Sequence, residues 1–287
     1  MAKNNPHSVD RSYKYLYKTL KIKFHRYLFH EGENIEFLET EIAETGQLKD
    51  LVVKVDDHLI RIIELMAKPL YDPKLIDIFD YVIYTLYDPQ YEDCKVTATG
   101  ISIANPHHGK NAVTISDNID FHLEIIFIKE KDGQKVLSTI IQKVLLNEEL
   151  SDDDAIELLL LPDMDIEVPI KTLMKTICYL IGLANIPDDD FKRRIIACER
   201  IILARFFKGD EFTEMVNLLK TETKYENIDS EFGEVFEARY YDGITDGMAK
   251  GILQVAENLL KNGFDDKIVS INTGIPLVEV KNIKRRL

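Results

Sequence analysis

Cysteine is scarce in this chain, with three residues among 287. Cys94, Cys178 and Cys198 lie far apart, are odd in number and lack the spacing of metal ligands. This pattern predicts reduced, buried thiols rather than a disulfide or a zinc site. No stretch approaches the roughly 18 apolar residues of a membrane-spanning helix, and the first residues contain no apolar signal core. We therefore expect a cytoplasmic protein without a membrane partner.

The motifs of several common enzyme classes are also missing. The sequence contains no GxSxG, HExxH or CxxC, which argues against the common hydrolase, zinc-protease and thiol-redox classes. Gly100 and Gly109 do not form a phosphate-binding loop. His107 and His108 are adjacent, so in a strand they would point apart, and no third ligand stands at a suitable spacing. We expect a polar loop at these histidines.

Charge is abundant but unevenly distributed. The chain is 45% apolar, which is enough to bury a core in one or two domains at this length. It is 30% charged, and its net charge is −14. Such an acidic chain repels the phosphate backbone at long range, which argues against broad non-specific nucleic-acid binding. Residues 1–30 nevertheless carry seven Lys or Arg against one acid, and the last seven residues carry four. These basic ends either contact phosphate locally or complement acidic segments within the fold.

The hydrophobic pattern predicts strands in the first half of the chain. Amphipathic spacing indicates helices, and short β-branched apolar runs between turn residues indicate strands. In chain order we expect a helix at 13–29, strands at 35–42, 50–55 and 59–66, a helix at 74–87, and a strand at 96–104. The dipeptide Asp132-Gly133 between residues 119–130 and 135–142 predicts a further hairpin.

The second half of the chain is predominantly helical in its periodicity. Ser151 precedes three acids and an apolar run, which predicts an N-cap and the start of a helix. Two or three helices follow at 169–220. The fold class is therefore α+β with a helical C-terminal region. The expected division is a core at 1–148, a helical region packed on or extending it at 149–222, a linker at 223–247 and a small helical tail at 248–287.

Two strand-borne carboxylates form the candidate site. If the turn between 50–55 and 59–66 has three residues, Asp50 lies directly opposite Glu64 on the same sheet face. A two-residue turn would break this pairing. Two carboxylates so close repel each other unless a positive charge lies between them, and a hard divalent ion such as Mg²⁺ takes oxygen ligands. The alternative is that Glu64 is a strand-end carboxylate that reaches solvent or pairs with a lysine. Arg61 should point to the opposite face.

This arrangement resembles a known family. The order of helix, strand 35–42, turn, Asp50-Leu-Val-Val-Lys-Val, turn and Arg61-Ile-Ile-Glu64 is similar to the core of the Rpn family. Its members are recombination-promoting nucleases and putative transposases of the PD-(D/E)XK superfamily. The Gly-spaced C-terminal segment with Ile271-Asn272-Thr273-Gly274 is similar as well. The resemblance implies a restriction-endonuclease-like αβββαβ core and a DNA endonuclease that uses Mg²⁺ or Mn²⁺. Asp50, Glu64 and the backbone carbonyl of Leu65 would be its metal ligands.

One departure from the family pattern affects the expected activity. The family has Lys or Gln two residues after the third-strand acid, where this chain has Met66, and a thioether is only a weak acceptor. Lys68 has the same strand parity and is the candidate replacement, unless it is a solvated strand-end lysine. A further acid could come from Glu31, Glu36, Glu39 or Glu41. The alternative function is a catalytically degenerate member that binds DNA or protein.

The C-terminal tail allows two interpretations. Its apolar residues can form a small core, and its last helix ends in Lys-Arg-Arg. It resembles a DNA-binding helix–turn–helix element, and it fits a helical hairpin that joins copies of the chain equally well. The residues of this core would be Ile268, Ile271, Ile275, Leu277, Val278, Val280 and Ile283.

Overall fold

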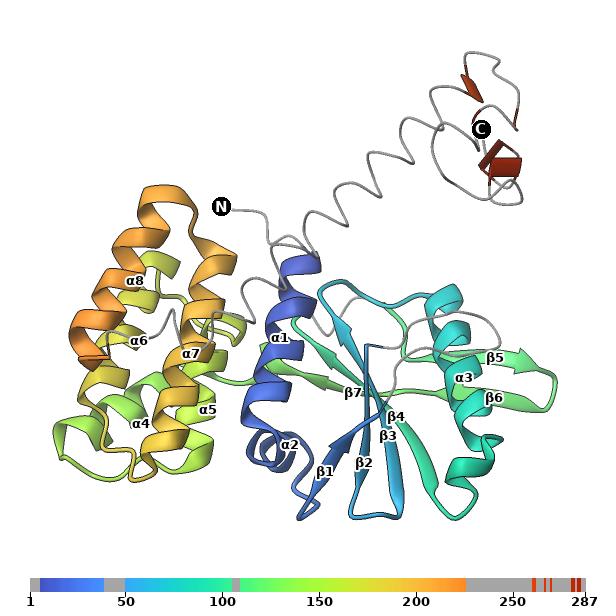
Figure 1. Ribbon diagram of the computed structural model, residues 1–287, viewed down its shortest axis with the longest axis horizontal. Coiled ribbons are helices and arrows are strands. Elements are labelled where there is room, and N and C mark those ends of the chain that lie inside the picture. Colours follow the sequence, from blue (N-terminus) through green and yellow to red (C-terminus); the bar gives the residue numbers. More distant parts are fainter. Residues whose placement is uncertain are drawn as a thin grey trace. The chain divides into compact units, whose positions relative to one another are not determined.

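The computed structural model describes residues 6–38, 50–104 and 109–225, together with single positions between 260 and 284. The chain divides into two compact units, Met1–Glu226 and Asn227–Leu287. Strands occupy the first part of the first unit and helices dominate its second part (Figure 1). The α+β class expected from the sequence is therefore confirmed.

Two helices open the described chain, where one helix at 13–29 was predicted. They are α1 (Pro6–Leu20) and α2 (Ile22–Phe29). Lys21 between them has a φ of 49°, in the left-handed region that no residue of a continuous right-handed helix adopts. This residue ends α1, and the apolar periodicity resumes in a new direction in α2.

A mixed five-stranded sheet forms the centre of the strand-rich part, in the order β1-β2-β3-β4-β7. The first three strands are antiparallel, whereas β3, β4 and β7 run parallel. Every residue of β3 is buried, as expected for a strand with near-continuous apolar sequence and neighbours on both sides. The strands are β1 (Ile35–Phe37), β2 (Leu51–Val55), β3 (Leu59–Met66), β4 (Lys95–Ser102) and β7 (Glu124–Phe127).

Helices cover both faces of this sheet. Helix α3 (Asp72–Leu86) has Pro73 in its first turn, a favoured position for proline. The apolar residues of α3 pack with the even-numbered residues of β3 in one core cluster. Alternation turns Arg61 of β3 to the opposite face, where its guanidinium lies 4.1 Å from the centre of the Phe29 ring of α2.

The hairpin predicted around Asp132-Gly133 is wrong. Residues 119–130 form β6 (Ile119–His122), β7 and a short 3₁₀ turn (Ile128–Glu130), and residues 135–142 lie within helix α4 (Gly133–Leu145). The Asp132 carboxylate accepts a hydrogen bond from the Lys135 amide and caps α4. Asp is a favoured N-cap as well as a turn residue, so this dipeptide marks a helix start here. Strand β6 pairs with β5 (Ala112–Ser116) in a separate two-stranded sheet.

The helical part begins at the cap predicted from the sequence. Ser151 and Asp154 form a reciprocal capping box at the start of α5, a pairing that satisfies two amides at a helix N-terminus. The three helices between 169 and 223 agree with the prediction. The remaining elements are α5 (Asp152–Leu160), α6 (Ile170–Leu183), α7 (Asp189–Phe206), α8 (Gly209–Thr223) and 3₁₀ turns at Pro89–Tyr91 and Leu161–Asp163.

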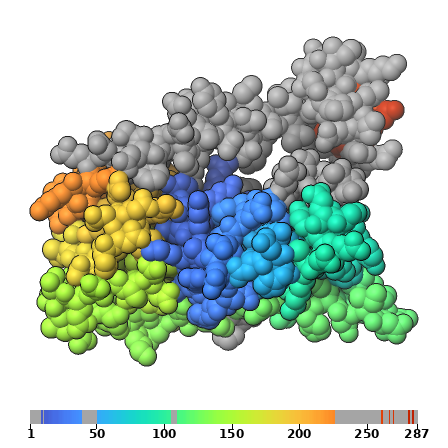
Figure 2. All heavy atoms as spheres, turned by 60° about the horizontal axis from the view of Figure 1, so that its bottom comes forward, coloured from blue at the N-terminus to red at the C-terminus, as the bar shows by residue number. Residues whose placement is uncertain are grey.

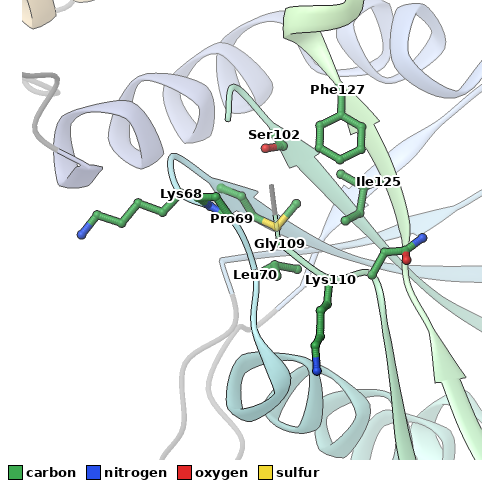
Figure 3. A pocket seen from close by; sticks show the side chains of 10 residues that line it. Lys68, Pro69, Leu70, Ser102, Gly109, Lys110, Ile125 and Phe127 are labelled. Carbon is green, nitrogen blue, oxygen red and sulfur yellow. The ribbon is translucent and has the colours of Figure 1, made fainter. Parts of the chain in front are cut away.

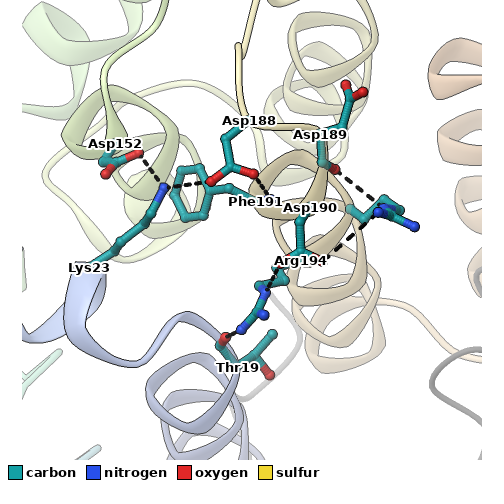
Figure 4. Close-up of polar contacts among 9 residues, drawn as sticks. Thr19, Lys23, Asp152, Asp188, Asp189, Asp190, Phe191 and Arg194 are labelled. Carbon is teal, nitrogen blue, oxygen red and sulfur yellow. Dashed lines mark hydrogen bonds and ion pairs between the residues drawn. The ribbon is translucent and has the colours of Figure 1, made fainter. Parts of the chain in front are cut away.

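The N-terminal helices join the sheet to the helical part. The Lys23 ammonium of α2 lies 2.9 Å from an Asp152 carboxylate oxygen and 3.2 Å from one of Asp188 (Figure 4). Arg194 of α7 donates to the Thr19 carbonyl at 3.0 Å. In the space-filling view, the helices of residues 150–225 lie on one side of the blue N-terminal helices and α3 lies on the other (Figure 2).

Few positions of the second unit are described. Leu260, Val269 and Val280 are buried together, and Ile283 packs against them. Lys284 and Asp266 form an ion pair at 2.6 Å. The predicted core residues Ile268, Ile271, Ile275, Leu277 and Val278, and nearly all of the predicted linker 223–247, lie outside the described residues. Within the described part of the chain, no helix is both long and apolar enough to span a bilayer.

Candidate functional site

The hairpin between β2 and β3 has the register that the candidate site requires. Leu51 pairs with Ile63 and Val55 with Leu59, which leaves the three turn residues 56–58. Asp56 and Asp57 both have positive φ values, 46° and 63°, a conformation that Asp tolerates better than most residues. One further step along this register places Asp50 opposite Glu64.

Glu64 is buried at the centre of the sheet. Its side chain is 2% exposed, and its Oε2 lies 2.8 Å from the Lys74 ammonium, which extends from the first turn of α3. Its Oε1 is buried and has no hydrogen-bond partner among the described residues. Burying such an oxygen without a partner is costly. Glu64 therefore presents one satisfied and one unsatisfied carboxylate oxygen.

Asp50 connects the sheet to the N-terminal helix. Its Oδ2 accepts a hydrogen bond from the Leu65 amide at 2.9 Å, and its Oδ1 lies 2.8 Å from the Lys14 ammonium of α1. The Leu65 amide thus holds the Asp50 carboxylate beside the strand position that follows Glu64. Each carboxylate of the pair is compensated by its own lysine.

The environment of Glu64 changes its protonation. Burial and, to a smaller extent, the nearby Asp50 raise the pKa of Glu64 to about 7, although Lys74 opposes both. Burial alone would lower the pKa of Lys74, but the Glu64 charge outweighs it, so that pKa is raised. The first shift favours a neutral Glu64 and the second requires a charged one. We favour a raised Glu64 pKa, because its Oε1 has no partner and a second carboxylate is close.

Met66 and Lys68, the two residues considered for the role of the expected Lys or Gln, lie in different surroundings. Met66 is 6% exposed within the apolar cluster under α3, and a Cβ at Gly100 would overlap its terminal methyl group. Strand β3 ends at Met66. Lys68 follows the strand, is exposed, and extends away from the other labelled residues (Figure 3).

An open recess adjoins the carboxylate pair. It has a volume of about 350 Å³ and is lined by residues 65–71, Pro73 and Lys74. A second cavity of about 180 Å³ lies beyond Met66 and includes Lys68 and Lys110 in its lining (Figure 3). Leu65, the predicted carbonyl ligand, lines the first recess. Lysines therefore stand around the point where β3 ends.

Two lysines of the site were not predicted from the sequence. In the sequence, Lys14 is only one of the seven basic residues of 1–30, and Lys74 is only the start of the helix expected at 74–87. Strand parity relates residues of a single strand. It therefore indicates Lys68 and gives no information on a lysine that belongs to a neighbouring helix. Proline at the start of α3 was the available signal, because it fixes where the first helical turn lies.

Of the other candidate acids, the structure describes Glu31 and Glu36, and it brings neither to the pair. Glu31 pairs with Arg61 on the opposite face of the sheet, as the parity of Arg61 predicted. Glu36 is exposed, whereas Glu39, Glu41, His107 and His108 lie outside the described residues. None of the three cysteines forms a disulfide. Cys178 and Cys198 are buried, as predicted, whereas Cys94 is only partly buried. The described residues contain no group of three or more His, Cys, Asp or Glu suited to a metal ion.

Comparisons with models of protein families, with curated proteins and with solved structures found no match to this chain.

Proposed function

We propose that this chain is a metal-dependent DNA endonuclease of the PD-(D/E)XK type, similar to the Rpn recombination-promoting nucleases and putative transposases. The observation that carries the proposal is the proximity of Asp50, directly before β2, to Glu64 of β3, with a buried Glu64 Oε1 that no described group satisfies. Unsatisfied carboxylate oxygens beside a second carboxylate are a good environment for a hard divalent cation.

The order of elements supports the same assignment. Helices α1 and α2 precede the three antiparallel strands, α3 follows β3, and β4 then pairs parallel to β3. This order agrees with a restriction-endonuclease-like αβββαβ core. The carboxylate pair lies where β2 begins and β3 ends, beside the open recess.

The proposed site offers two carboxylates and one backbone carbonyl, which are oxygen ligands of the kind that Mg²⁺ or Mn²⁺ takes. Asp50, Glu64 and the Leu65 carbonyl would hold the ion, as three oxygen donors from one hairpin. The bound ion would polarise the phosphodiester and lower the pKa of a water molecule. Hydrolysis would form a bond from the water oxygen to phosphorus and break one ester P–O bond, with a water proton passing to the leaving alkoxide. Asp50 and Glu64 would hold the ion, and the lysines beside the recess would compensate the phosphate charge.

A plasmid-nicking assay tests this function. Purified protein with Mg²⁺ or Mn²⁺ should convert supercoiled plasmid to the open circle, and the Asp50→Ala and Glu64→Ala variants should each lose the activity by about 100-fold or more. Lys175→Met serves as a control, because Lys175 forms exposed ion pairs with Glu214 on the helical part. Nicking that survives both carboxylate substitutions would remove the assignment of the site.

The burial of Met66 favours a second candidate function. A thioether cannot supply the charge or the hydrogen bonds of the family's Lys or Gln, so the chain could be a degenerate member that binds DNA or protein without cutting. A DNA-binding protein of that kind would slow the migration of DNA in a gel-shift assay and would not nick plasmid with either metal. The proposed location is the cytoplasm, and self-association through the C-terminal helices is part of the same proposal.

A further inference from the structure

The two lysines of the carboxylate pair occupy different positions relative to its free oxygen. Lys14 contacts Asp50 Oδ1 and Lys74 contacts Glu64 Oε2. Glu64 Oε1 has no partner among the described residues. A cation that bonded to Oε1 would leave the Lys74 contact intact. The same cation would compete with Lys14 for Asp50, because both Asp50 oxygens are already engaged.

Helix α3 holds Lys74 at a defined place. The residues on either side of it are Pro73, which fixes the first turn, and Leu75, which is 0% exposed. The Lys74 ammonium also lies 5.5 Å from the centre of the Tyr81 ring, one of the apolar cluster residues. Lys74 is thus anchored on both sides, whereas Lys68 is exposed and follows the end of β3.

We propose that Lys74 is the positioning lysine of the reaction and takes the role that Met66 cannot perform. This inference rests on the proposed nuclease function. Lys74 extends from α3, and its ammonium lies beside Glu64. The residue also lines the recess in which a phosphodiester would bind. Lys14 has the opposite role: it neutralises Asp50 in the metal-free protein and gives way to the ion.

Kinetics and metal binding separate these roles. With Mn²⁺ as the metal, Lys74→Met should lower kcat for plasmid nicking by about 100-fold or more, the usual scale for loss of one charge-stabilising group. KM should stay within about threefold, because Lys68 and Lys110 remain in the two cavities to contact the backbone phosphates. Lys74→Arg retains the charge and should recover activity to within about tenfold of the wild type. Lys175→Met is the control for loss of a lysine elsewhere.

Calorimetric titration with Mn²⁺ gives a readout that is independent of turnover. Lys74→Met should bind Mn²⁺ at least as tightly as the wild type, since it removes a positive charge near the ion. Lys14→Met should bind Mn²⁺ about tenfold more tightly, because the ion no longer competes with the ammonium for Asp50. If Lys74 had only a structural role, the Lys74→Met substitution would instead lower both the thermal stability and the Mn²⁺ affinity.

The outcomes distinguish this inference from the function on which it rests. Wild-type kcat in Lys74→Met, or a kcat loss in Lys68→Met that Lys74→Met lacks, would overturn the role of Lys74 and leave the nuclease in place. Equal loss of activity in Lys74→Met and Lys74→Arg, with weakened Mn²⁺ binding, would make the residue structural and also overturn the inference. A wild-type protein that neither binds Mn²⁺ nor nicks DNA would remove both proposals.

Discussion

Glu199 of α7 is fully buried, and neither of its carboxylate oxygens has a partner among the described residues. Burial raises its pKa to about 8, and Arg205 only partly opposes this. The folded protein therefore binds this proton more tightly than the unfolded chain, whose Glu pKa is 4.5. The contribution to the free energy of unfolding is complete below about pH 4.5 and is lost as the pH rises towards 8.

Glu199→Gln should remove this pH dependence, because the amide has a similar shape and cannot ionise. At pH 8 we expect the variant to exceed the wild type in free energy of unfolding by on the order of 3 kcal/mol, with little difference at pH 5. Urea denaturation at the two pH values measures this. A wild-type protein as stable at pH 8 as at pH 5, with the variant parallel to it, would contradict the assignment.

Met66 offers a second test at the residue scale. Its side chain fills the space between Gly100 and the apolar residues under α3. Met66→Ala should lower the free energy of unfolding by about 2–5 kcal/mol, the usual cost of emptying such a site. Met66→Leu retains most of the volume and should cost less than about 1.5 kcal/mol. Equal stability of the Ala variant and the wild type in urea would show that Met66 is not part of the core.

The sequence indicated the carboxylate pair but not its lysines. Asp56-Asp57-His58 is a polar turn between two apolar runs, which allowed a three-residue turn without fixing its length, and the register of the structure supplies the facing of Asp50 and Glu64. Lys74 and Lys14 reach the pair from helices on either side of β2 and β3. Their positions depend on how those helices pack, which no local spacing specifies.

At the scale of elements, a buried ion pair joins three separate segments. Arg205 of α7 donates two hydrogen bonds to Asp163 at 2.6 and 2.8 Å, and Tyr13 of α1 donates to the same carboxylate at 3.1 Å. Arg205 and Asp163 are 2% and 3% exposed. The ion pair thus fixes α1 against the helical part. Tyr13 is the neighbour of Lys14, whose ammonium contacts Asp50 in the proposed site.

Arg205→Met should lower the free energy of unfolding by about 3–5 kcal/mol, because it leaves Asp163 buried and uncompensated. The double variant with Asp163→Asn should lose less than the sum of the two single variants, since neither charge is then left alone. A double-mutant cycle in urea measures this coupling. Strict additivity of the two effects would contradict a direct interaction.

The predicted elements agree with the structure where the length of an apolar run and its periodicity indicate the same type of element. Residues 59–66 form a strand because the apolar run is too short for a helix and is bounded by turns. The same logic was wrong at 135–142, where β-branched residues suggested a strand, whereas Gly133, Leu137 and Ile140 form the buried face of α4. Only the cap at Asp132 and the packing against residues 164–166 decide in favour of the helix.

At the scale of the whole molecule, the two compact units should unfold separately. Val280 is fully buried against Leu260 and Val269 in the second unit. Val280→Asp buries an unpaired charge there, which is strongly unfavourable, and should abolish the calorimetric transition of residues 227–287 alone. The transition of the first unit should keep its midpoint within about 2 °C of the wild type. A single transition in the wild type that the variant shifts as a whole would show that the units are coupled.

The net charge of −14 makes the local lysines decisive for any contact with DNA. A phosphate approaching the recess would meet Lys68 and Lys74 there, and Lys110 in the neighbouring cavity, while the rest of the acidic molecule repels it at long range. Under the proposed function, the site would therefore attract a phosphodiester only at short distance, where a divalent ion between Asp50 and Glu64 would add the largest positive charge.

Calorimetric titration of the full chain with Mn²⁺ tests that central claim most directly. Since Asp50 and Glu64 are adjacent and Glu64 Oε1 is unsatisfied, we predict one bound ion per chain in the wild type. We predict its loss in both Asp50→Asn and Glu64→Gln, which preserve the shape of the side chains and remove the charge. Undiminished Mn²⁺ binding in either variant, or none in the wild type, would contradict a shared metal site.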